Sequence, residues 1–183
     1  TMYSHSSYGR PLIRTLLLVC STISATAALG SDMKGAQQEI LRSAQLWQSK
    51  YRTDLARQHV EKLLLVEPNS PWGLATLASI ALQENKTTEA KQIIEKLRAQ
   101  NAAPEVMLQL QRLLKLYEPQ AQQELAQMRL FAQSGRAKEA ALLAQKLFPE
   151  GPLALGGFAL EYYRTIAAAP GVNPELEKAL LSE

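Results

Sequence analysis

The sequence is almost without cysteine and histidine. Among its 183 residues the only cysteine is Cys20, and the only histidines are His5 and His59. One cysteine cannot form an intramolecular disulfide, and zinc sites built on thiolates need several cysteines. Two histidines are too few for a multi-histidine metal centre. We therefore expect no disulfide, no metal site and no cofactor.

An excess of charge of one sign is also lacking. The formal net charge is +3, and two of the basic residues, Arg10 and Arg14, lie before residue 30. The remainder holds 18 basic and 17 acidic residues, with no basic stripe interleaved with aromatic side chains. Nucleic-acid-binding domains show such a stripe or patch. We therefore expect no nucleic acid among the partners.

Motifs that carry catalysis are absent as well. There is no P-loop, no GxSxG and no HExxH, and Gly151, Gly156 and Gly157 follow proline rather than a strand. His59 has no base or orienting residue near it in sequence, so a partly exposed helix residue is the simpler interpretation. The sequence predicts that this chain is not an enzyme and has no catalytic residues.

The N-terminal segment has the order of a secretory signal peptide. Residues 10–29 read RPLIRTLLLVCSTISATAAL, in which two arginines precede an apolar run that ends in small residues. Cleavage after Ala27 would leave a mature part outside the cytoplasm. A signal anchor is the alternative, although the apolar run is short for a membrane span. A lipoprotein signal at Cys20 is a weaker alternative, because Val19 is large for the position before a lipidated cysteine.

The rest of the chain predicts one helix after another. Good helix formers fill the segments between prolines, and Gly73 is the only glycine between residues 36 and 134. Prolines break helix interiors but are tolerated in the first turn, so they mark helix boundaries. No stretch alternates apolar and polar residues as a strand would. The expected helices cover residues 36–50, 53–67, 71–84, 87–100, 104–117, 119–134, 137–148, 152–168 and 174–182.

A sequence repeat runs through the first part of this region. Ala44 recurs as Ala78 and Ala56 as Ala90, both at the same spacing. In a first unit that starts at Gln37, small residues at offsets 8 and 20 let two helices approach closely, and larger apolar residues fill the space beside them. This is the tetratricopeptide (TPR) pattern. The residues at offsets 8, 11, 20, 24 and 32 are Ala44, Trp47, Ala56, Val60 and Pro68.

The third unit is out of register with the first two. It fits the pattern when it starts at Ala121, well beyond one repeat length after the second start at Pro71. The additional segment, PEVMLQLQRLLKLYEP, corresponds to one helix with its turn. The sequence therefore predicts an all-α fold, a TPR-like superhelix of helical hairpins (an α-solenoid) with one unpaired inserted helix. We expect a leader at 1–30, two TPR units at 31–103, the unpaired helix at 104–118 and further units at 119–183, cut off in mid-repeat as in a piece of a longer protein.

TPR stacks bind ligands in a concave groove lined by the first helix of each hairpin. The groove offsets carry many amides and little charge, and they lack the basic clamp that would hold a peptide carboxylate. Amides and an aromatic ring suit sugar hydroxyls and sugar faces, whereas an ordinary solvated helix face is the alternative. The candidate groove residues are Gln45, Gln48, Trp72, Ser79, Gln83, Gln122, Arg129 and Gln133.

The stretch from about Glu39 to Ile166 resembles the N-terminal TPR region of bacterial cellulose synthase operon protein C. Three segments carry the resemblance, and their order behind a signal peptide is more specific than the TPR pattern alone. They read LLLVEPNSPWGLATLA, AQQELAQMRLFAQSGRAKEAALLAQKLF (behind the unpaired helix) and PEGPLALGGFALEYYRTIAAAPG.

The resemblance implies a periplasmic scaffold, associated with the outer membrane in the full-length protein. Further repeats and an outer-membrane β-barrel that passes the glucan chain would follow in a C-terminal part not present here. The implied partners are the periplasmic or inner-membrane subunits of the synthase and the nascent glucan chain. The alternative hypothesis is a general periplasmic TPR adaptor that binds peptides or envelope proteins.

Overall fold

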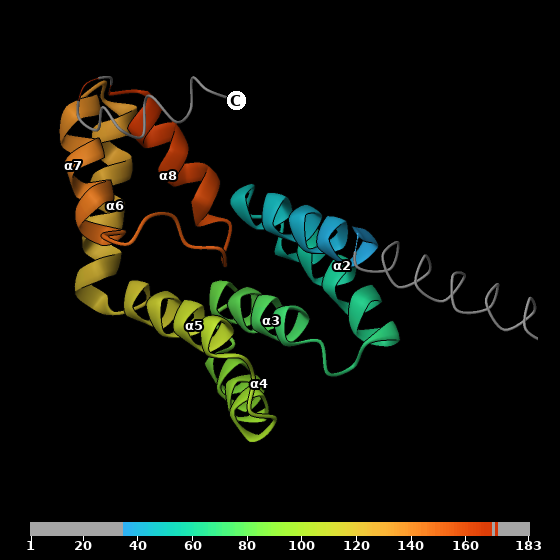
Figure 1. Ribbon diagram of the computed structural model, residues 1–183. Coiled ribbons are helices and arrows are strands. Elements are labelled where there is room, and N and C mark those ends of the chain that lie inside the picture. Colours follow the sequence, from blue (N-terminus) through green and yellow to red (C-terminus); the bar gives the residue numbers. More distant parts are fainter. Residues whose placement is uncertain (1–34, 170, 172–183) are drawn as a thin grey trace, which may run out of the picture. The chain divides into compact units, whose positions relative to one another are not determined.

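A computed structural model describes residues 35–169 and residue 171 (Figure 1). By its internal contacts the chain divides into Thr1–Glu39 and Ile40–Glu183. Of the first unit, residues 35–39 are described, and they are helical. The predicted signal peptide and the predicted helix over residues 174–182 lie outside the described residues.

The described part of the chain is a succession of helices without any β-strand, as the sequence predicted. A helix covers residues 35–49, which we call the first helix. After it come α2 (Thr53–Val66), α3 (Pro71–Gln83), α4 (Thr87–Ala99), α5 (Pro104–Leu116), α6 (Pro119–Gln133), α7 (Ala137–Leu147) and α8 (Phe158–Ala167). Three of these helices begin at a proline, where the missing N–H costs nothing because the first-turn donors have no partner within the helix.

One helix is shorter than predicted. The sequence predicted a helix over residues 152–168, but α8 begins only at Phe158. Gly156 and Gly157 precede it with φ of +75° and +74°, a left-handed conformation that ends or prevents an α-helix. Residues 148–157 therefore form a loop between α7 and α8.

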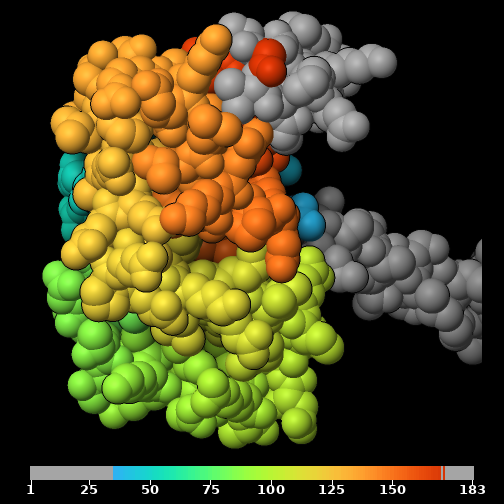
Figure 2. Space-filling view, turned by 90° about the vertical axis from the view of Figure 1, so that its left-hand side faces the viewer, coloured from blue at the N-terminus to red at the C-terminus, as the bar shows by residue number. Residues whose placement is uncertain are grey.

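A single helix, α5, lies between two hairpins, α3–α4 and α6–α7. The α3 helix packs on α4 and α6 packs on α7, whereas α5 contacts α3 on one side and α6 on the other. Figure 2 shows the yellow residues of α6 next to the yellow-green residues of α5. This arrangement confirms the predicted all-α, TPR-like fold with one unpaired helix.

Alanines stand where the helices of a hairpin approach most closely. Ala44, Ala56, Ala78 and Ala90 are completely buried, and Ala140 is almost so. A small side chain at these points allows the backbones to approach and larger neighbours to fill the flanks. The buried residues form two clusters. A large one extends from α3 to α8, and a small one contains Ala44, Ala56, Val60 and Ile80.

A search of the described helices for a membrane span gave none that is both long enough and apolar enough.

An arginine in α2 ties the first two repeats together. The Arg57 guanidinium contacts Glu84 at 2.7 Å and Glu89 at 2.8 Å, and the side chains of Arg57 and Glu84 are only 19% and 15% exposed. Burial tends to raise the pKa of Glu84, but hydrogen bonds from Arg57 and Lys86 outweigh it, so the pKa lies below its ordinary value of 4.5. Ion pairs screened from water in this way contribute more to stability than exposed pairs do.

We expect Arg57→Gln to lower the free energy of unfolding by about 1–2 kcal/mol at pH 7. A carboxyl whose pKa is lowered by folding stabilises the fold above its unfolded pKa, and that contribution is lost as the pH falls through the folded pKa. The difference between wild type and variant should therefore shrink from pH 7 to pH 3, as measured by urea unfolding. Arg98→Gln is the control, because Arg98 and Glu95 form an exposed pair. An equal effect of the two variants would contradict the prediction.

Candidate functional site

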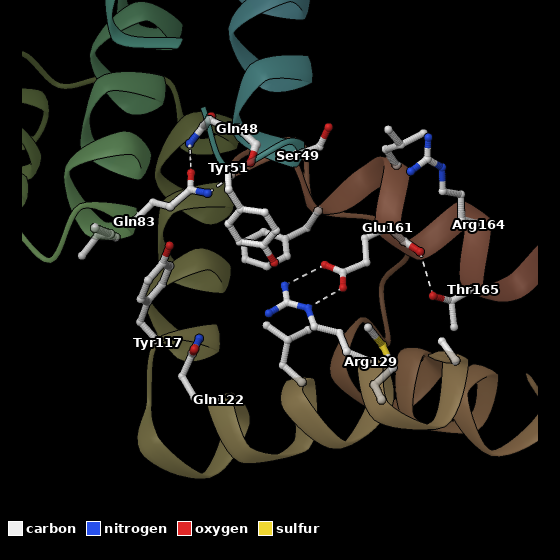
Figure 3. Close-up of a pocket in the computed structure, with 18 of the residues that line it drawn as sticks. Gln48, Ser49, Tyr51, Gln83, Tyr117, Gln122, Arg129, Glu161, Arg164 and Thr165 are labelled. Carbon is white, nitrogen blue, oxygen red and sulfur yellow. Dashed lines mark hydrogen bonds and ion pairs between the residues drawn. The ribbon is translucent and has the colours of Figure 1, made fainter. Parts of the chain in front are cut away.

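A cavity of about 590 Å³ lies where the first helix, α3, α6 and α8 come together. Its volume falls in the range of about 300–1,000 Å³ that is usual for small-molecule sites. Both ends of the described repeats contribute to it, and Tyr51, Tyr117, Arg129 and Glu161 surround a common space (Figure 3). The polar or aromatic residues that line it are Gln48, Ser49, Tyr51, Gln83, Asn85, Tyr117, Gln122, Arg129, Gln133, Phe158, Glu161, Arg164 and Thr165.

An amide network forms the side of the cavity next to α3. Gln48 is 1% exposed, and its Nε2 donates to Ser79 Oγ at 3.0 Å and to Gln83 Oε1 at 3.3 Å. Gln83 Nε2 donates in turn to the backbone oxygen of Gln48 at 3.1 Å. A buried amide must have its donors and acceptors satisfied, and this network does so. Gln48 and Ser79 therefore hold Gln83 in place at the cavity wall.

The opposite side carries an ion pair and an aromatic ring. Arg129 of α6 donates from Nε and Nη2 to the two carboxylate oxygens of Glu161 in α8, at 2.6 and 2.9 Å. This two-point geometry fixes the orientation of both planar groups. The guanidinium carbon lies 5.8 Å from the centre of the Tyr51 ring, within the range of a cation–π contact. In Figure 3 the Tyr51 ring points toward the pair from the end of the first helix.

A second tyrosine, Tyr117, lies between α5 and α6. Burial raises its pKa to about 12, so its hydroxyl keeps its proton and remains a hydrogen-bond donor throughout the physiological pH range. The amide of Gln122 donates to the backbone oxygen of Leu116 beside it. These groups give the cavity fixed donors and acceptors without adding charge.

The α7–α8 loop (residues 148–157) closes the cavity against the first helix. Gln45 Nε2 donates to the backbone oxygen of Ala154 at 2.5 Å, and Arg112 Nη2 donates to that of Gly151 at 2.6 Å. Gly157 lies so near the end of the first helix that a Cβ atom would stand 2.6 Å from the backbone nitrogen of Ser49. Leu153 and Leu155 of the loop are themselves buried. The loop therefore forms a fixed part of the cavity wall.

Five of the eight predicted groove residues line this cavity, namely Gln48, Gln83, Gln122, Arg129 and Gln133. Gln45 lies beside it, with its amide engaged by the α7–α8 loop. Ser79 needs correction, because it is completely buried. It is buried where α3 meets the first helix, and Gln48 Nε2 donates to its hydroxyl at 3.0 Å. Trp72 is half-buried, packs against the large core cluster and does not line the cavity. Binding by the five lining residues stays a prediction.

Most residues of the cavity were not among those predicted from the sequence, and Tyr51, Tyr117 and Glu161 are three of them. Tyr51 and Tyr117 lie just after a helix end. The TPR offsets assign Tyr51 to a turn, and they do not apply to Tyr117, which belongs to the inserted segment. Glu161 comes from α8, whose approach to α6 depends on the shape of the preceding loop. A signal for Tyr51 did exist, because it lies one repeat length before Asn85, at the break that ends the next helix of the same kind.

Among residues 35–169 and 171, no group of three or more histidine, cysteine or acidic side chains is placed to hold a metal ion.

Comparison with known proteins identifies related sequences, although no family model matches. Cellulose synthase operon protein C of Salmonella typhimurium is 32% identical over 172 residues, which cover 91% of this chain and 14% of that protein. The protein of the same name from Escherichia coli K12 is 30% identical over 140 residues, or 76% of this chain and 12% of its own length. This chain thus spans only a small part of the length of the curated relatives that it matches.

A solved structure has a similar fold. The flexible tandem repeat domain of the C subunit of bacterial cellulose synthase superposes with a TM-score of 0.56 at 26% identity, covering 80% of this chain and 60% of that one. Sequence and fold therefore agree, and they confirm the resemblance predicted from the residues: over most of its length this chain is similar to the helical repeat region of cellulose synthase operon protein C.

Proposed function

We propose that this chain is a non-enzymatic scaffold segment of a periplasmic, outer-membrane-associated exporter similar to cellulose synthase operon protein C. In this role it supports cellulose synthesis and export through contacts with subunits of the synthase, with the glucan chain, or with both. The observation that carries the proposal is the similarity over 91% of the chain to a protein of that name. The signal-peptide pattern of residues 10–29 supports the periplasmic location.

The lining of the cavity supports a binding role over catalysis. Glycoside hydrolases of the usual kind need two carboxylates that flank the scissile bond. Glu161 is the one carboxylate among the described lining residues, and both its oxygens accept hydrogen bonds from Arg129. A carboxylate engaged in this way is oriented to form a fixed surface rather than to transfer a proton.

A general adaptor for periplasmic proteins remains the alternative function. Its support is the exposure of large apolar side chains on three of the helices. At the end of α2, Leu65 is 83% and Val66 is 66% exposed, and Leu130 and Leu142 on α6 and α7 are about as exposed as Val66. Exposed apolar side chains that gather in patches mark protein contacts.

Two binding measurements on the chain separate these functions. We expect the chain to retain the periplasmic subunit of cellulose synthase in a pull-down, or to bind cello-oligosaccharides in calorimetric titration. A set of unrelated extended peptides serves as the control. Binding of the peptides, with neither the synthase subunit nor the oligosaccharides bound, would contradict the scaffold and favour the adaptor.

A further inference from the structure

The first helices of the three hairpins end with the same backbone geometry and with very different residues. Tyr51, Asn85 and Gly135 each follow the first helix of a hairpin and have φ of 58°, 60° and 76°. At each end the next residue donates its N–H to a carbonyl five residues back, at 2.8–2.9 Å, which is the Schellman type of helix ending. The three positions have the same spacing along the chain as the starts of the three repeat units.

Tyrosine is the unexpected residue of the three. Glycine and asparagine are the residues that tolerate a left-handed backbone, and a bulky side chain there is strained. Burial does not compensate for the strain, because Tyr51 is 65% exposed. Its ring instead points into the cavity, near the guanidinium of Arg129. Strain held at a cavity is a reason to seek a role for the side chain rather than for the backbone.

The groups around the ring define the chemistry of a ligand. The charge of Arg129 is balanced by Glu161, so the pair presents polar edges with no net charge. Gln83 and Gln122 add amides, and Tyr117 adds a hydroxyl. Arg164 also lines the cavity, but in Figure 3 its guanidinium lies apart from the ion pair. A flat aromatic face beside neutral donors and acceptors matches a hexose ring, which has apolar C–H faces and hydroxyl edges.

We propose that this cavity is a binding site for a short stretch of neutral β-linked glucan, with Tyr51 as the platform on which one sugar ring stacks. The Arg129–Glu161 pair and the glutamine amides would contact the hydroxyl groups of the adjoining sugars. A β-1,4-linked chain is a flat ribbon that presents its ring faces in succession, which suits an exposed ring at the edge of a cavity. The proposal rests on the proposed function, and it assigns the glucan contact named there to this cavity.

The test removes the ring of Tyr51 and at the same time relieves the backbone strain at this position. Tyr51→Gly should fold at least as well as the wild type, with a melting temperature that is equal or higher, because glycine accepts the left-handed conformation. In calorimetric titration with cellohexaose we expect it to lose at least tenfold in affinity. Stability and binding then change in opposite directions, so misfolding cannot explain a loss of binding.

Two matched variants and a second sugar complete the experiment. Asn101→Gly makes the same kind of backbone change at a left-handed residue outside the cavity, and Tyr163→Ala removes an exposed tyrosine outside it. Both should bind cellohexaose within twofold of the wild type. Maltohexaose, whose α-linkages curve the chain, should bind the wild type at least tenfold more weakly than cellohexaose.

Three results would overturn the proposal: no cellohexaose binding by the wild type, unchanged binding by Tyr51→Gly, or equal binding of maltohexaose. A pull-down of the synthase subunit with Tyr51→Gly keeps this result separate from the proposed function. If the subunit is retained while no sugar binds, the scaffold stands and the glucan site fails. If neither binds, the proposed function fails as well.

Discussion

Gly157→Ala should lower the free energy of unfolding by about 2–4 kcal/mol. Two effects add up in this estimate. A left-handed backbone, with φ of +74° at Gly157, costs an L-residue about 1 kcal/mol or more. The new methyl group would also stand 2.6 Å from the Ser49 nitrogen and 3.0 Å from the Gln45 oxygen, and overpacking of this kind typically costs about 1–3 kcal/mol. Backbone atoms within a helix cannot move aside as a flexible side chain can.

Gly135→Ala separates the two effects. Gly135 has a similar φ of +76°, but a Cβ atom there would meet nothing within 4 Å. This variant should therefore lose only the conformational part, about 1 kcal/mol. Urea unfolding of both variants measures the difference, which reports the approach of the α7–α8 loop to the first helix. Equal losses would show that the loop does not press against the first helix in solution.

The helix boundaries could be predicted because their causes are local. Proline at a helix start acts on its own residue and its neighbours, so α3, α5 and α6 begin at the predicted prolines. The close helix approaches were also predictable, since the regular repeat spacing places alanine opposite alanine. The unpaired helix followed from the segment that is added between the second and third repeats.

The α7–α8 loop could not be predicted because its causes are distant in sequence. The hydrogen bond between Gln45 and Ala154 joins residues that are 109 positions apart. Gly156 and Gly157 signal a turn, but they do not say which surface the turn meets. The sequence predicted a helix over 152–168 because Pro152 suits the first turn of a helix and Leu153 and Leu155 suit its buried face. The structure has a loop over the first part of this range, and the two leucines are buried in it.

The candidate site was predicted only in part, and the reason is related. The offsets of a regular repeat place Ser79 and Trp72 on an open groove, and they assume that each stack continues unchanged. Gln48 of the first helix contacts Ser79, so this part of the groove face is interior, whereas Gln83 of the same face lines the cavity. Gln122 and Arg129 lie on α6 and also line the cavity. Tyr51 could have been found by comparing turn residues across the repeats rather than the groove offsets alone.

Leu110→Ala is expected to lower the free energy of unfolding by about 3 kcal/mol, which is as much as Gly157→Ala. Leu110 is 1% exposed, in the row of buried residues that α5 shares between α3 and α6. Its loss leaves a cavity in the large cluster, and α5 has no hairpin partner that would hold it when this face loosens. Leu108→Ala is the control on the same helix, since Leu108 is 47% exposed. It should change the free energy of unfolding by no more than about 0.5 kcal/mol.

Two optical signals show how far the damage from Leu110→Ala spreads. Both tryptophans, Trp47 and Trp72, lie before α4, so tryptophan emission follows the first repeats, whereas far-UV circular dichroism follows all helices. In the wild type the two denaturation curves should coincide, because α5 couples its neighbours as stacked repeats do. In Leu110→Ala the dichroism should fall at lower urea than the emission, since α6–α8 lose their support first. Coincident curves in the variant would show that the α7–α8 loop alone is enough to couple the two ends, and a loss no larger than that of Leu108→Ala would contradict the buried role of α5.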